Sequence, residues 1–87
     1  MSVRVELYGI PRERAGTACT SAAGARLGEV LADLATRFPR LAETCIAGAR
    51  LQPGYVANLN GQRFVTDPGT IIQAGDALLI LSADAGG

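Results

Sequence analysis

Apolar and polar residues alternate along the first segment of the chain that has the length of a strand. Val3, Val5 and Leu7 are apolar, and the residues between them are charged. A period of two is typical of a strand with one buried face and one solvated face. Glycine and proline interrupt the next stretch, so the sequence predicts a loop over 9–15. A weaker strand is predicted over 17–22, paired antiparallel with the first.

The next pattern has the spacing of a helix. Apolar residues recur every three or four positions over 27–38, which predicts the main helix of the fold. Pro39 cannot continue a helix and disfavours helical geometry in the residue before it, so the helix should end at Phe38. Residues 40–54 follow no period. They are predicted to be irregular, with room for one short helical turn.

The last third of the chain reads as strands again. Two short runs, 55–59 and 62–65, flank Asn60-Gly61, the dipeptide that favours a type I′ hairpin turn. A continuous apolar run over 77–81 suits a central strand. The order strand, strand, helix, hairpin, strand predicts a two-layer α+β domain of the β-grasp, or ubiquitin-like, type. We expect a mixed sheet of four to five strands on one main helix, with the first and last strands adjacent at its centre.

The alternation of side chains along a strand also predicts which of them point away from the core. If Leu78 and Ile80 point to the helix, the residues next to them point to the other face of the sheet. This predicts an apolar patch beside the root of the tail, where a partner protein would dock. The alternative is a last strand that is buried on both faces. The partner-binding residues predicted in this way are Tyr8, Phe64, Leu79 and Leu81, together with Ala85 of the tail.

Composition narrows the chemistry that the chain can perform. Eight arginines balance eight acidic residues, and the 87 residues include neither lysine nor histidine. A Ser–His or Cys–His pair, an imidazole zinc site and a lysine nucleophile are therefore excluded. No basic stripe indicates nucleic acid binding. We expect no metal site, and a binding or carrier module rather than an enzyme.

Cysteine usage and hydropathy suggest a location. Cys19 and Cys45 form no CxxC motif and are interpreted as two reduced thiols, although a disulfide stays open. No apolar run approaches the roughly 18 residues of a membrane helix, and no signal peptide is recognisable. The expectation is a cytoplasmic protein that binds no membrane.

The end of the chain carries the most informative motif. One domain is predicted over 1–82, followed by a flexible tail over 83–87 that ends in Gly86-Gly87. Two residues without Cβ atoms let a backbone enter a narrow channel in a partner. Taken alone, such an ending is equally consistent with a frayed terminus.

Together these features resemble the MoaD/ThiS family of ubiquitin-like sulfur carriers over nearly the whole length. The Arg-Glu-x-x-Gly segment is most similar to the small subunit of molybdopterin synthase. The tail, however, lacks the proline associated with those subunits. The motifs that carry the resemblance are Arg12-Glu13-Arg14-Ala15-Gly16, the Phe38-Pro39 helix end, Asn60-Gly61, Gly75-Asp76 and Gly86-Gly87.

The resemblance implies a function centred on Gly87. An ATP-dependent activating enzyme would adenylate the Gly87 carboxylate, and a sulfur source would displace AMP to leave a thiocarboxylate. The sulfur would pass to an acceptor such as the molybdopterin synthase large subunit, and this chain would bind no cofactor itself. Two alternatives stay open: a carrier for thiamine, cysteine or another thio-metabolite, and an interaction module whose Gly-Gly is incidental. Arg12 and Arg14 are interpreted as parts of a solvated loop rather than as salt-bridge partners, and Asp76 as a turn residue.

Overall fold

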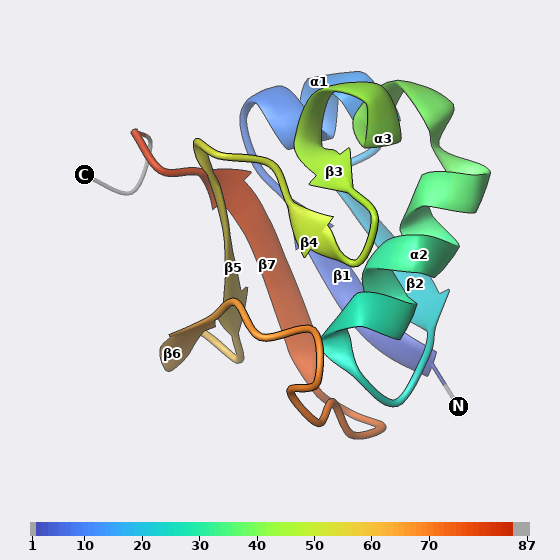
Figure 1. Ribbon diagram of the computed structural model, residues 1–87, viewed down its shortest axis with the longest axis vertical. Helices are drawn as coiled ribbons and strands as arrows, with labels where there is room; N and C mark the ends of the chain where they lie inside the picture. The colour runs from blue at the N-terminus through green and yellow to red at the C-terminus, as the bar shows by residue number, and fades with distance from the viewer. Residues whose placement is uncertain (1, 85–87) are drawn as a thin grey trace.

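The protein is a two-layer α+β structure in which helices cover one face of a mixed sheet (Figure 1). The computed structural model describes residues 2–84. No helix in this part of the chain is long and apolar enough to cross a membrane. In chain order the elements are β1 Ser2–Leu7, α1 Ile10–Ala15, β2 Cys19–Ala23, α2 Leu27–Arg37, α3 Pro39–Cys45, β3 Ile46–Ala47, β4 Arg50–Leu51, β5 Tyr55–Leu59, β6 Arg63–Val65 and β7 Ala77–Ser82.

The main sheet has the strand order β2-β1-β7-β5-β6, which confirms the predicted β-grasp arrangement. The first and last strands, β1 and β7, lie side by side and parallel, with Val5 opposite Leu78. All other pairs in this sheet are antiparallel. Because β7 is paired on both sides, the C-terminal segment leaves from the middle of the sheet rather than from an edge.

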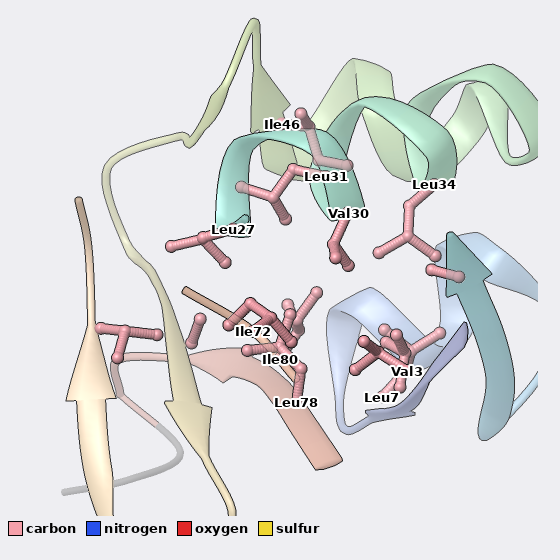
Figure 2. Close-up of a cluster of buried hydrophobic side chains, with 14 of the residues drawn as sticks. Val3, Leu7, Leu27, Val30, Leu31, Leu34, Ile46, Ile72, Leu78 and Ile80 are labelled. Atoms are coloured by element: carbon pink, nitrogen blue, oxygen red, sulfur yellow. The ribbon is translucent and has the colours of Figure 1, made fainter. Parts of the chain in front are cut away.

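The core lies between the sheet and α2 (Figure 2). The apolar stripe of α2 contributes Val30, Leu31 and Leu34, each of them fully buried. From β7, Leu78 and Ile80 point into the same core and have no exposed surface. The alternation expected for the last strand is therefore confirmed, and so is the helix, which ends at Arg37 with Phe38 as its cap.

The prediction of a loop over 9–15 is wrong, because residues Ile10–Ala15 form helix α1. The residues that indicated a loop are boundary signals of this short helix. Pro11 lies in the first turn, where a missing amide hydrogen costs nothing, and its ring is buried. Gly16 ends the helix at φ 76°, with its amide donating to the Arg12 carbonyl at 2.9 Å.

The prediction of an irregular segment over 40–54 is also wrong for most of its length. Pro39 begins helix α3, which buries Leu41 and Cys45 one turn apart. The chain then forms a small antiparallel hairpin, with Ile46 opposite Leu51. These elements are short, so packing against the core rather than a sustained period makes them regular.

The Asn60-Gly61 turn is confirmed and is also tied to β7. Both residues have positive φ, 60° and 70°, as a type I′ turn requires. The Asn60 side chain donates to Asp76 Oδ1 at 3.0 Å and accepts from the Ala77 amide at 2.8 Å. Asp76 also accepts from the Gln73 amide at 2.8 Å. These hydrogen bonds lower the pKa of Asp76, the Gln73 amide having the largest effect. Its bond from the Gln73 amide agrees with the role expected for Asp76 in shaping the turn before the last strand.

Replacement of Asn60 by glycine should lower the melting temperature by about 4–8 °C, since two side-chain hydrogen bonds with a net worth near 1 kcal/mol are lost. Glycine accepts the positive φ, so the turn itself is retained. Thermal unfolding followed by circular dichroism measures the change. The control is Gln62→Ala, in the same turn, whose exposed side chain makes no hydrogen bond among residues 2–84. Equal melting temperatures for both variants would contradict the proposed link between the hairpin and β7.

Candidate functional site

The face of the sheet opposite the helices carries a row of side chains from four strands. Strand register places Glu6 opposite Leu79, Leu79 opposite Asn58, and Asn58 opposite Phe64. One step nearer the C-terminal end of β7, Val56 lies opposite Leu81. Tyr8 lies beside them, because its amide donates to the Ile80 carbonyl at 3.1 Å. We call the apolar members of this face the outer patch: Tyr8, Val56, Phe64, Leu79 and Leu81.

Exposure decides between the two interpretations of the last strand. Phe64 is 62% exposed and Tyr8 is 42% exposed, while Leu79 and Leu81 are half-buried. Leu78 and Ile80, on the opposite face, are fully buried. The last strand is therefore buried on one face only within the described chain, and Tyr8, Phe64, Leu79 and Leu81 lie on one accessible surface. Whether a partner binds there stays a prediction.

Two members of this face were missed from sequence. Val56 lies opposite Leu81 of the outer patch, and Asn58 lies between Leu79 and Phe64. The signal was available, since residues 56 and 58 alternate with the buried Ala57 and Leu59. The Asn58 Oδ1 atom is buried without a hydrogen-bond partner in the described part of the chain.

A polar border lies along β1. The Tyr8 hydroxyl donates to Glu6 Oε1 at 2.7 Å, and Arg4 Nε donates to Glu6 Oε2 at 3.1 Å. The bond from Tyr8 and then the one from Arg4 lower the pKa of Glu6, while the bond to Glu6 raises the pKa of Tyr8. The Glu6 carboxylate therefore stays ionised and holds the Tyr8 ring at the edge of the outer patch.

The root of the tail lies next to this surface. Strand β7 ends at Ser82, opposite Tyr55, and the Ala83 amide donates to the Gly54 carbonyl at 2.8 Å. The chain thus leaves the sheet one residue after Leu81 of the outer patch. Ala85, Gly86 and Gly87, predicted as partner-binding and reacting residues, lie outside the described residues, as does most of the predicted flexible tail.

A second group of side chains meets near the tail root on the helix side. Arg14 of α1 lies near Cys45 of α3 and Tyr55 of β5. Burial raises the pKa of the Cys45 thiol and of the Tyr55 hydroxyl, and the positive charge of Arg14 partly offsets both shifts. The interpretation of Arg14 as part of a solvated loop is therefore wrong. Arg14 is half-buried on a helix, whereas Arg12 is exposed.

The two cysteines are free thiols in different surroundings, Cys19 exposed and Cys45 buried. A thiol reagent at neutral pH should therefore modify one thiol quickly in the native protein and two in urea, because a buried thiol with a raised pKa supplies little thiolate. Absorbance of the released chromophore counts the thiols. The Cys19→Ser variant should show none in the native state and one in urea. Equal rates for both thiols in the native wild type would contradict the burial of Cys45.

A sheet with a parallel central pair and a helix across one face defines a ubiquitin-like β-grasp protein. Solved structures share this fold over nearly the whole chain. The small archaeal modifier protein SAMP1 of Haloferax volcanii is 23% identical, with 100% of both chains covered and a TM-score of 0.81. A chain of the Amycolatopsis orientalis BexX/CysO complex is 26% identical, with 98% and 99% covered and a TM-score of 0.79. A putative molybdopterin converting factor subunit 1 from Pyrococcus furiosus is 18% identical, with 94% and 97% covered and a TM-score of 0.77.

The model of the ThiS family matches residues 5–87. The chain therefore belongs to the ThiS family, and the resemblance to MoaD/ThiS carriers is confirmed. Comparison with curated proteins gives no match.

Proposed function

We propose that this protein carries sulfur as a thiocarboxylate on Gly87, in the synthesis of the molybdenum cofactor. The observation that carries the proposal is the outer patch directly beside the root of a tail that ends in two glycines, in a chain of the ThiS family. A partner that binds Leu79, Leu81 and Phe64 fixes the position of the folded domain, and the tail then extends into the partner's active site. In this proposal the sheet binds the partner, and the tail carries the reacting group.

The proposed chemistry proceeds in two steps on the Gly87 carboxylate. A carboxylate oxygen attacks the α-phosphorus of ATP, and pyrophosphate leaves, so that a poor electrophile becomes an acyl-adenylate. Sulfide then attacks the acyl carbon, the bond to the AMP oxygen breaks, and a thiocarboxylate and AMP result. The activating enzyme binds the nucleotide and moves the protons, since the chain has neither histidine nor lysine. In this proposal the protein is a substrate and carrier rather than a catalyst. The requirement of the activating enzyme for ATP is consistent with a cytoplasmic location.

The proposed acceptor is a molybdopterin synthase large subunit, on the strength of the Arg12-Glu13-x-x-Gly16 segment. The match at 26% identity to a chain of the BexX/CysO complex supports a second candidate, a carrier that delivers sulfur to another thio-metabolite. Both candidates use the same Gly87 chemistry and differ only in the acceptor that docks. Sulfur transfer from the loaded carrier to purified acceptor enzymes of each kind distinguishes them.

The experiment that tests the proposal is intact mass spectrometry after incubation with an activating enzyme, ATP and sulfide. The expected result is the mass gain of one oxygen replaced by sulfur, localised to Gly87 by fragmentation. The variant that lacks Gly87 is the matched control and should show no gain. No gain for the full chain, with an activating enzyme that loads its own carrier and binds this one, would overturn the carrier proposal in favour of an interaction module.

A further inference from the structure

Strand β2 forms one edge of the main sheet and lies next to helix α2 (Figure 1). The Leu7 amide donates to the Ala18 carbonyl at 2.8 Å, which fixes the hydrogen-bonded positions of the antiparallel pair of β1 and β2. Because such positions alternate along the ladder, the backbone amides and carbonyls of Cys19, Ser21 and Ala23 point away from β1, toward the edge of the sheet. Backbone groups that point outward in this way can pair with a strand of another molecule.

Two side chains of α2 bind the backbone at this edge. Asp33 Oδ2 accepts a hydrogen bond from the Ala23 amide at 3.0 Å. Arg37 Nη2 donates to the Ser21 carbonyl and also to Asp33 Oδ2, the second bond being 3.0 Å long. Since Asp33 and Arg37 lie about one helical turn apart, they form an ion pair that runs along the strand. A neighbouring strand reaches the Ser21 carbonyl and the Ala23 amide only if this ion pair is displaced.

The sequence of β2 itself offers little protection against pairing with another strand. Its residues, Cys19–Ala23, are all small, and they include no charged residue and no proline. The opposite edge of the sheet differs, because β6 is only 3 residues long and carries the exposed Arg63. Short length and charged side chains commonly keep an edge strand from pairing with another chain. At β2 the charged side chains come instead from the neighbouring helix.

We infer that the Asp33–Arg37 ion pair shields the β2 edge and keeps two copies of the protein from pairing through it. A second copy fits this edge, because antiparallel pairing of β2 with itself about a two-fold axis at Ser21 sets each outward amide opposite a carbonyl. The strand has no charge that would repel its copy, and the net charge of the chain is zero. The edge contains no residue of the outer patch, so the inference is independent of the proposed sulfur chemistry.

The experiment compares the wild type with the double variant Asp33→Ala/Arg37→Ala by sedimentation equilibrium at several protein concentrations. Alanine favours the helix, so α2 is retained while the edge is opened. The dimer dissociation constant of the double variant should be lower than that of the wild type by about tenfold or more, because the uncovered backbone groups form hydrogen bonds between strands. The matched control is Arg40→Ala/Glu43→Ala. It removes one charge of each sign from exposed positions on α3 and should leave the dissociation constant unchanged.

Two further variants locate the contact. Ser21 is exposed, and Ser21→Lys added to the double variant places like charges opposite each other at the two-fold axis, so the dissociation constant should return to that of the wild type. Arg37→Ala alone keeps the bond from Ala23 to Asp33 and should give an intermediate constant, which tests the inference even if the double variant is unstable. Circular dichroism checks that each variant is folded. Folded variants that associate no more than the control, or association that Ser21→Lys leaves unchanged, would overturn the inference.

Discussion

Phe64→Ala is expected to weaken binding to the activating enzyme by about tenfold to a hundredfold, the usual range for an aromatic anchor at an interface. Phe64 is 62% exposed on β6, so it contributes little to the core but offers the largest apolar surface of the outer patch. The stability change should stay below about 1 kcal/mol, as expected for a substitution on the exposed face of a strand. Isothermal titration calorimetry measures the affinity, and thermal unfolding measures the stability.

The protein provides a matched control at Ile71. This residue is also large, apolar and exposed, at 51%, but it pairs with Arg26 at an isolated bridge away from the outer patch. Ile71→Ala should leave the affinity unchanged within about twofold. Loss of affinity in both variants would indicate a general effect of surface hydrophobicity, and unchanged affinity in Phe64→Ala would remove Phe64 from the docking surface.

Gly86→Val is expected to reduce the rate of thiocarboxylate formation by about a hundredfold or more, while docking stays intact. A β-branched side chain in a channel shaped for bare backbone clashes with its walls, and a cost of about 3 kcal/mol corresponds to that factor. The fold should not change, since the substitution lies beyond the last strand. Initial rates from the intact-mass assay, together with calorimetric affinities, separate the two effects.

Ala83→Val is the control for Gly86→Val. Ala83 is exposed and uses only its backbone, donating to Gly54, so its replacement places the same valine side chain at the root of the tail. Its rate should stay within a few-fold of the wild type. If Gly86→Val reacts as fast as Ala83→Val, a glycine before Gly87 is not needed for entry into the active site, and Gly87 alone is the reacting end.

Much of this fold could be predicted because the patterns are local and strong. The alternation in β1, the stripe on α2 and the Asn60-Gly61 turn each specify an element from neighbouring residues alone. Strict alternation along the last strand correctly predicted that the Leu78 side chain points into the core and that the Leu79 side chain points to the opposite face. The predicted patch residues of the sheet therefore share one surface.

The two short helices could not be predicted from the local sequence pattern. In α1 and α3 the sequence offers only one or two turns, too few for a period to emerge. Such segments are helical because Pro11, Leu41 and Cys45 are buried against the rest of the protein. The same packing moves Arg14 from an expected solvated loop to a half-buried position near Cys45 and Tyr55, so its surroundings were not visible in the sequence.

What the sequence by itself determined is the first strand, the main helix, the Asn60-Gly61 hairpin, the outward face of the last strand and the Gly86-Gly87 ending, because each depends on residues adjacent in the chain. Only the tertiary structure decided which residues become neighbours across strands: Phe64 beside Asn58, Asn58 beside Leu79, and Val56 beside Leu81. Register between β5, β6 and β7 is a property of the closed sheet and its core, since one residue of slip would turn every side chain to the opposite face. For that reason the outer patch and the surroundings of Arg14 follow from the fold and not from any one segment.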